Sequence, residues 1–438
     1  MAVAGVRARR QRHLPPLTLI TRLNAARSGL DLSSAGCARR RYTPYGVTFI
    51  THGFTERLLG IALLAATIPV LRSESPLVIR AGEDISARVN RAPAGTYFLL
   101  KAGHHTRQTV TPKDGMSFVG EDGTILDGEG VTSYAFETLH TDPRGVTIKG
   151  LTIERYAPPP QHGAIQGDNG RDWVIDGNII RDNSHIGLRT GAGFVVRRNR
   201  VYGNGVIGIS GHRADAARIE ENEVFENGGG AGTETPATAE ASGLKFLRTH
   251  DLIVRGNQVV RNLGIGIWSD TNYPTVVIEH NTVSENRGAG IWHEAGYAAV
   301  IRYNTVERNG GLTPGNWLTR AGIQVTNASN VQISTNKVTN NANGIGVMQT
   351  GGYPDGPYGP LRVENVQVTD NSVTMTIGRT GLAQNTGDRR VFTEWHNRFD
   401  NTTYHLGPNR FYFLWDERLL DERGWQAAGN DRSGRFIR

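Results

Sequence analysis

Short runs in which apolar and polar residues alternate recur along the middle of the chain. Residues 217–227 are typical: ARIEENEVFEN alternates, is interrupted by Asn222, alternates again and closes on Asn227. Alternation with period two predicts strands that bury one face. Asn tolerates the left-handed backbone conformation of a sharp bend, so we expect each asparagine to form the bend itself. Each run therefore predicts two short strands joined by a tight corner.

The same phrase appears seven times between Trp173 and Asn341. Its first asparagines are Asn178, Asn199, Asn222, Asn257, Asn281, Asn304 and Asn336, and each has a second asparagine five residues later. The spacing of 21 to 35 residues is typical of a solenoid whose repeat is interrupted by loop insertions. Stacked at one position per coil, these amides would form a hydrogen-bonded ladder, so we assign them a structural role.

A third apolar run follows each second asparagine, for example IGIWSD at 265–270 and AGIWHE at 289–294. Three strands per coil, wound in parallel with right-handed connections, predict an all-β fold: a single-stranded right-handed parallel β-helix. We expect at least nine coils. The boundaries we predict are a leader over 1–75, an N-terminal cap with the first coils over 76–144, repeats over 145–380 and an aromatic-rich C-terminal cap over 381–438.

Three insertions interrupt the period, at Gly228–Ala241, Gly310–Arg320 and Thr350–Leu361. Loops of this kind often carry function, and in repeat proteins they gather on one face, so we expect them to wall a groove.

Departures from the repeat gather on the third strands. Alternation places two columns of side chains outward on rungs about 4.8 Å apart. The first column is Gln166, Arg189, Ser210, Lys245, Trp268, Trp292, Gln324 and Met348. The second column is Asp168, Gly191, His212, Leu247, Asp270, Glu294, Thr326 and Thr350. Charged and aromatic residues at neighbouring rungs make this face the candidate functional surface.

Two carboxylates, Asp270 and Glu294, occupy equivalent positions on successive rungs. They could act as the acid and nucleophile of a retaining glycoside hydrolase, which needs a separation of about 5 Å. They could also bind Ca²⁺ through oxygen ligands. A third interpretation is a solvated salt-bridge ladder with Lys245, one rung earlier.

Basic residues on the same face suggest cleavage of a uronic-acid polymer by β-elimination. That reaction needs the substrate carboxylate neutralised, the C5 proton removed and the leaving oxygen protonated. Lys245 or His212 would be the base, and Arg189, with Asp270 and Glu294, would bind the uronate. The remaining substrate contacts would come from Arg248, His293 and the two tryptophans, Trp268 and Trp292. Alternatively, an insertion such as Gly310–Arg320 covers the tryptophans.

The net charge of +7 changes the picture little. Residues 1–58 carry ten arginines and two acids, so the basicity belongs to the leader and gives no reason to expect nucleic-acid binding. The single cysteine, Cys37, also lies there, which leaves the repeats without disulfides. The apolar run Leu58–Leu71 is too short for a comfortable membrane span and suits a signal peptide, which predicts a secreted protein without a stable membrane span.

The coils, the G-x-G-I/A-G-I third strands and the segment GTYFLLKAG…PKDGMSFVGEDGTILDG resemble the pectate-lyase-like superfamily, over roughly residues 75–380. The resemblance is to secreted bacterial proteins with parallel β-helix repeats. It implies a polysaccharide-active protein, since the superfamily includes pectate and alginate lyases, polygalacturonase-type hydrolases, uronate epimerases and phage tailspikes. The sequence lacks the N-T-D motif of polygalacturonases and the D-P-H-D motif of mannuronan epimerases, so no family catalytic residue is carried over.

We therefore expect an extracellular lyase on acidic glycans. A glycoside hydrolase is the second hypothesis. A non-catalytic glycan-binding or surface-structural solenoid is the third, because a fold of this kind does not fix a function.

Overall fold

The computed structural model describes residues 75–438, apart from 230–238, 312 and 315–316. The leader, with its apolar run Leu58–Leu71, and most of the first insertion lie outside the described residues, so the signal-peptide prediction stays a prediction. Within the described part of the chain, no helix is long and apolar enough to cross a membrane.

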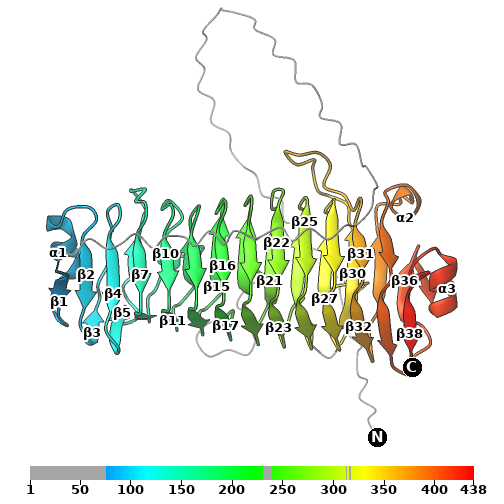
Figure 1. Cartoon of the computed structure of the whole chain (residues 1–438), viewed down its shortest axis with the longest axis horizontal. Coiled ribbons are helices and arrows are strands. Elements are labelled where there is room, and N and C mark those ends of the chain that lie inside the picture. Colours follow the sequence, from blue (N-terminus) through cyan, green and yellow to red (C-terminus); the bar gives the residue numbers. More distant parts are fainter. Residues whose placement is uncertain (1–74, 230–238, 312, 315–316) are drawn as a thin grey trace, which may run out of the picture. The chain divides into compact units, whose positions relative to one another are not determined.

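Three sheets run side by side along the coils, and nearly all of their strands pair in parallel (Figure 1). The first sheet is β1 (Leu77–Ile79), β2 (Tyr97–Leu100), β4 (Ser117–Gly120), β7 (Thr147–Lys149), β10 (Val174–Asp176), β13 (Val195–Arg197), β16 (Arg218–Glu220), β19 (Ile253–Arg255), β22 (Val276–Glu279), β25 (Ala299–Arg302), β28 (Val331–Ser334), β31 (Gln367–Thr369) and β34 (Arg398–Asp400).

The second sheet is β3 (Gly103–Thr106), β5 (Thr124–Asp127), β8 (Thr152–Glu154), β11 (Ile179–Arg181), β14 (Arg200–Tyr202), β17 (Glu223–Phe225), β20 (Gln258–Val260), β23 (Thr282–Ser284), β26 (Thr305–Glu307), β29 (Lys337–Thr339), β32 (Ser372–Met375), β35 (Thr403–Leu406) and β38 (Arg435–Ile437).

The third sheet is β6 (Phe136–Glu137), β9 (Gly163–Gln166), β12 (Ile186–Thr190), β15 (Ile207–His212), β18 (Ser242–Leu247), β21 (Ile265–Asp270), β24 (Ile291–Glu294), β27 (Ala321–Thr326), β30 (Asn343–Gln349), β33 (Thr380–Gln384), β36 (Phe413–Trp415) and the antiparallel β37 (Arg418–Leu420). Each coil adds one strand to each sheet, which confirms the predicted parallel β-helix with three strands per coil.

Parallel pairing in register places like residues on like residues inside the coil. The apolar positions of successive strands are buried, for example Ile175, Val196, Ile219, Val254 and Ile278 in the first sheet. Aromatic rings also stack from coil to coil, as Trp173 and Phe194 do, with centroids 5.2 Å apart and planes 14° apart. The core is therefore a continuous column that grows with each coil.

The asparagines form two hydrogen-bonded ladders, as predicted. Oδ1 of Asn199 accepts from the backbone N–H of Asn178 at 2.9 Å and from its side-chain amide at 3.0 Å, and the pattern repeats along the stack. The left-handed backbone, however, belongs to the residue before each asparagine, such as Arg198 (φ 52°) and Glu221 (φ 56°). The expectation that asparagine itself forms the bend was wrong, because its contribution is the amide that links the coils.

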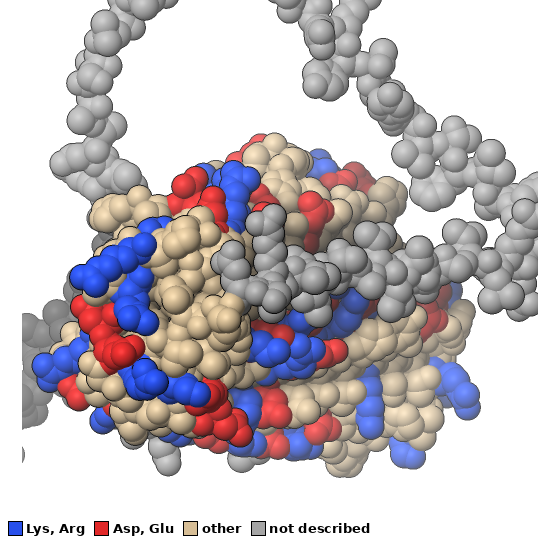
Figure 2. Space-filling view, turned by 60° about the vertical axis from the view of Figure 1, so that its left-hand side comes forward, with Lys and Arg blue, Asp and Glu red and all other residues tan. Residues whose placement is uncertain are grey.

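On the outer surface, basic and acidic side chains lie interspersed (Figure 2). Many are paired across rungs: Glu279 bridges Arg255 and Arg302, and Asp176 bridges Arg197 and Arg198. This pairing balances the surface charge of the coils, in line with the near-neutral composition beyond the leader.

Short helices lie at both ends of the stack (Figure 1). Helix α1 (Ile85–Arg91) begins at Asp84, whose carboxylate accepts from the backbone N–H of Ala87. At the other end lie α2 (Arg390–Thr393) and α3 (Glu422–Ala427). Trp425 of α3 is fully buried and stacks on Phe413 at 4.9 Å, so the last coil's apolar end is covered.

Candidate functional site

The third sheet brings the outward residues of successive rungs into register. Lys245 pairs with Trp268 and Trp268 with Trp292, while Asp270 pairs with Glu294. The side chains that the sequence placed in adjacent columns are therefore neighbours on β18, β21 and β24.

One rung departs from the predicted alignment. Ile345 of β30, and not Val347, pairs with Ile323, so Met348 lies beside Thr326 in the second column. Both apolar residues are buried, and alternation alone offered either register. Gly346 takes the place in the first column that was predicted for Met348. Leu318 of the second insertion packs against the backbone of Gly346.

Lys245 belongs to what we call the tryptophan cluster, which consists of Lys245, Trp268, Asp270, Trp292 and Glu294. Its side chain is 3% exposed; Nζ lies 3.2 Å from a carboxylate oxygen of Asp270 and forms a second ion pair with Glu240. The same Nζ lies 3.4 Å from the centre of the Trp268 ring, a close cation–π contact. The predicted salt bridge between rungs is present, but it is largely buried rather than solvated.

The two tryptophans stack on each other, with centroids 4.9 Å and planes 9° apart. Lys245 contacts a face of Trp268 and Trp292 stacks on it as well, which leaves Trp268 buried, whereas Trp292 is half-buried. The indole N–H of Trp268 donates to Glu294 at 3.0 Å, and that of Trp292 donates to Thr326 at 3.0 Å. Trp268 thus supports the cluster from within, and Trp292 is the more accessible ring.

Glu294 ties the cluster to the third insertion. Its carboxylate also accepts from the hydroxyl of Tyr353 at 2.7 Å. Burial and the neighbouring Asp270 raise the pKa of Glu294, although the bonds from Tyr353 and Trp268 oppose the rise. Burial likewise raises the pKa of Asp270 against the opposing charge of Lys245.

Described contacts place two insertions at the tryptophan cluster: Glu240 of the first pairs with Lys245, and Tyr353 of the third bonds Glu294. In the insertion at 310–320, which we expected as a cover of the tryptophans, the buried Leu318 packs against Met348 and Ala383, further along the stack. Its length and composition gave no indication of which rung it would contact.

These carboxylates do not fit a Ca²⁺ site. Calcium takes six to eight oxygen ligands, in the usual range for proteins. Asp270 is already neutralised by Lys245, and Glu294 accepts from two uncharged donors. In the described ranges of the chain, no group of three His, Cys, Asp or Glu side chains is placed to hold a metal ion. We derive no chemistry through calcium.

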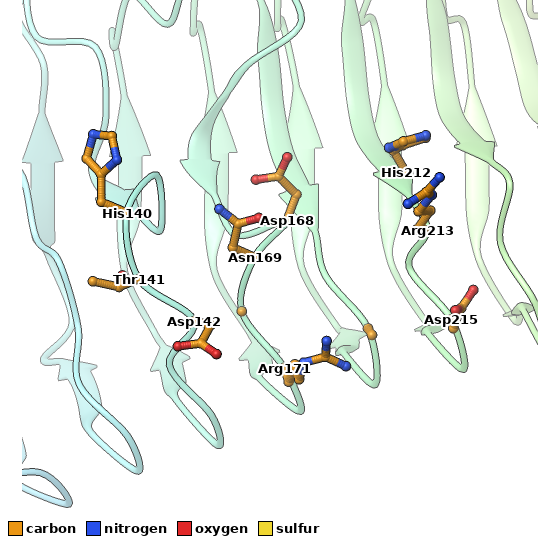
Figure 3. Close-up of a pocket in the computed structure, with 11 residues that line it drawn as sticks. His140, Thr141, Asp142, Asp168, Asn169, Arg171, His212, Arg213 and Asp215 are labelled. Atoms are coloured by element: carbon orange, nitrogen blue, oxygen red, sulfur yellow. The ribbon is translucent and has the colours of Figure 1, made fainter. Parts of the chain in front are cut away.

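A polar cleft opens next to this cluster, in the turns that follow β6, β9, β12 and β15 (Figure 3). Its volume is about 680 Å³. It is lined by His140, Thr141, Asp142, Asp168, Asn169, Gly170, Arg171, Ala192, His212, Arg213 and Asp215. The sequence singled out Asp168 and His212 among these. The sequence did not indicate the other lining residues, because they lie in turns of varying length, outside the two outward columns.

His212, at the end of β15, is the titratable group of the cleft that stands out. It is partly exposed, and Figure 3 shows it projecting from the same turn as Arg213. Burial, together with the charges of Arg189, Arg213 and Arg248, lowers the pKa of His212, and Asp168 opposes the shift. The imidazole is therefore held neutral at neutral pH, which leaves a ring nitrogen able to accept a proton.

The three arginines differ in how far they are engaged. Arg189 pairs with Asp168 at 3.3 Å and donates to the carbonyl of Gln161 at 2.8 Å. Arg213 and Arg248 are exposed, and neither forms an ion pair with a described residue. Arg248 acts electrostatically on both His212 and Asp270, so it lies between the cleft and the tryptophan cluster.

His293 does not reach this surface. It is fully buried, with Nδ1 2.9 Å from the hydroxyl of Ser269 and Nε2 2.9 Å from the carbonyl of Tyr297. Burial lowers its pKa to about 4. Its neighbours fix a turn, so His293 is at most a positioning residue and contacts no ligand on the outer face.

Comparisons with known proteins support the fold. Residues 112–238 and 233–317 match the family model described as a right handed beta helix region. A mannuronic acid specific polysaccharide family 6 lyase from human gut microbiota superposes with a TM-score of 0.55 at 13% identity, covering 83% of this chain and 91% of that one. The catalytic unit of an alpha-1,3-glucanase from Streptomyces thermodiastaticus gives 0.49 at 12% identity, over 84% and 69% of the two chains.

A surface protein and adhesin of Streptococcus pneumoniae also superposes, with a TM-score of 0.47 at 11% identity, covering 71% of this chain and 100% of that one. No curated protein matches the sequence. The superposition on the lyase, at 13% identity, supports the fold and not an activity. With its three parallel sheets, its asparagine ladders and the matching family model, the chain is a right-handed parallel β-helix protein.

Proposed function

We propose that this protein acts on acidic polysaccharides, as a lyase that cleaves uronic-acid-containing glycans by β-elimination. The observation that carries the proposal is the environment of His212: a neutral imidazole at the wall of an open polar cleft, surrounded by three guanidinium groups. Such a constellation matches a substrate that is both anionic and the source of a weakly acidic proton.

The arginines and His212 have different roles in the reaction. Arg213 and Arg248, exposed and without ion pairs to described residues, bind and neutralise the uronate carboxylate, which acidifies the neighbouring C5–H bond. His212 takes the C5 proton. The electrons of that bond form the C4=C5 double bond while the C4–O bond breaks, and the imidazolium returns its proton to the leaving oxygen.

Of the two bases that the sequence offered, His212 is favoured over Lys245. Nζ of Lys245 is held by Asp270 and Glu240 and its side chain is almost inaccessible, so it would have to leave both partners to reach a substrate. Lys245 and Trp268 instead support Trp292, which stacks on Trp268.

The test is the ultraviolet absorbance of the unsaturated product formed from polymannuronate or polygalacturonate. We expect His212→Ala to abolish it, and Arg213→Ala to raise KM. His405→Ala is the matched control, because His405 is exposed on β35, in the second sheet. Wild-type rates in His212→Ala would contradict the assignment of the base.

A glycoside hydrolase is the second candidate function, and the raised pKa values of Asp270 and Glu294 on paired strands favour it. Glu294 would be the acid and Asp270 the nucleophile. New reducing ends without ultraviolet absorbance, lost in Glu294→Gln, would select this reaction. Binding to a uronate polymer without any product would select the non-catalytic glycan-binding solenoid.

A further inference from the structure

Beyond the cleft, the turns of the following coils carry an aromatic cluster. Its members are His250 after β18, Tyr273 after β21, Tyr297 after β24, and Tyr358 from the insertion at 350–361. Tyr358 lies 5.5 Å from Tyr273, 5.3 Å from Tyr297 and 5.8 Å from His250, measured between ring centres. One residue of the insertion thus contacts the turns of three successive coils.

The insertion is fastened at this place by polar contacts as well. The hydroxyl of Tyr358 lies 3.2 Å from Nε2 of His250, and the hydroxyl of Tyr297 donates to the carbonyl of Gly359 at 2.9 Å. Tyr353, five residues earlier, is anchored to Glu294. Side-chain contacts therefore hold the insertion at two places, at Tyr353 and at residues 358–359.

Despite these anchors, the two tyrosines remain open to solvent. Tyr358 is 52% exposed to solvent, and Tyr353 is 39% exposed. All three ring contacts of Tyr358 are edge-to-face, so no described aromatic ring stacks on it. A rigid, exposed aromatic surface of this kind is a preformed contact site for an apolar face of a ligand.

The cluster continues the cleft rather than standing apart from it. Asp215 lines the cleft, and its carboxylate accepts from the backbone N–H of His250 at 2.9 Å. From the coil of Asp215 to that of Tyr273 is two rungs, about 10 Å along the stack. A linear polymer bound in the cleft and running parallel to the stack reaches the aromatic cluster within a few sugar units.

We propose that Tyr358, with Tyr353 of the same insertion, forms an aromatic subsite that stacks on the apolar C–H face of a pyranose ring of the polymer. The inference rests on the proposed uronate-binding function of the cleft and adds the second point of contact. Its consequence is a dependence on chain length: long oligomers contact both places, and short ones contact only the arginines around His212.

The test is calorimetric binding of mannuronate and galacturonate oligomers, from dimers to octamers, to the full chain in a His212→Ala background. We expect Tyr358→Ala to weaken octamer binding about three- to tenfold, the size of one aromatic contact, and to leave dimer binding unchanged. Tyr358→Phe keeps the ring and should retain octamer affinity. Tyr303→Ala is the matched control, since Tyr303 is exposed on another turn of the stack.

The outcomes separate the subsite from the lyase. Unchanged octamer affinity in Tyr358→Ala, or an equal loss for dimers and octamers, overturns the subsite even if the wild-type protein releases unsaturated product. A length-dependent loss, together with no unsaturated product from the wild-type protein, supports the subsite and overturns the lyase. If neither oligomer series binds, both proposals fall.

Discussion

At the scale of single residues, burial separates side chains that the sequence could not tell apart. Lys245 and His212 both lie on outward positions of the third sheet. Lys245 is enclosed by two carboxylates and an indole ring, whereas His212 opens to a cleft and is surrounded by arginines. Outward positions of one sheet therefore give a supporting cation in one coil and an accessible base in another.

The pH dependence of activity follows from the charges around His212. The base must be neutral, so activity is present above the pKa of His212 and is lost as the pH falls through it. Because burial and the arginines hold that pKa below its ordinary value of 6.5, we expect the acid limb of kcat/KM below pH 6.5.

Replacing Arg248 by alanine removes one of the cations that lower this pKa. The acid limb should therefore move to higher pH, apart from any loss of affinity. Arg261→Ala, at an exposed ion pair with Glu226, should leave it in place. An unshifted limb in Arg248→Ala would mean that His212 is not the group that titrates.

At the scale of the structural element, two successive residues form the corner between two strands of a coil. The residue before the asparagine adopts the left-handed backbone, and the asparagine supplies the amide that bonds to the next coil. Sequence alone located the corners, because alternation stops there. It assigned the bend to the wrong residue because asparagine has both properties, and only coordinates show which one is used.

The ladder predicts a large cost for a small substitution. Oδ1 of Asn257 accepts from the backbone and the side chain of Asn222, and its amide donates to Asn281 and to the carbonyl of Ile219. Asn257→Ala leaves these buried groups without partners, so we expect a loss of about 3 kcal/mol in the free energy of unfolding, measured by denaturant titration.

The control for this substitution is Asn409→Ala. Asn409 is exposed, and its side-chain amide donates only to the carbonyl of Thr376 at 3.3 Å, so its replacement should cost less than about 0.5 kcal/mol. Equal losses in the two variants would show that the ladder adds no stability beyond that of a surface amide.

At the scale of the whole molecule, each coil contacts only its neighbours, so a defect at one end should remain local. The exceptions are the insertions, which reach back across several coils: Tyr353 and Tyr358 contact residues 59 and 108 positions away in sequence. The cleft and the aromatic cluster lie on one side of the stack because their turns all follow strands of the third sheet.

The C-terminal cap gives the test of this locality. Trp425→Ala removes a buried ring that stacks on Phe413, so the last coils should open more readily. In hydrogen exchange, we expect faster exchange in β34 and β36 and unchanged exchange in β10. Uniformly faster exchange along the chain would instead show that the stack unfolds as one cooperative unit.

The pattern of apolar and polar residues predicted the repeat: three strands per coil, the asparagine corners and the outward columns that hold Arg189, Lys245 and Asp270. These features follow from local alternation. The same alternating pattern recurs in every coil, so each coil supports the same prediction. The tertiary structure alone decided which side chains pair, which turns line the cleft around His212, and where Tyr353 and Tyr358 dock. Those contacts join insertions and turns of irregular length to distant coils, and no periodic pattern encodes their positions.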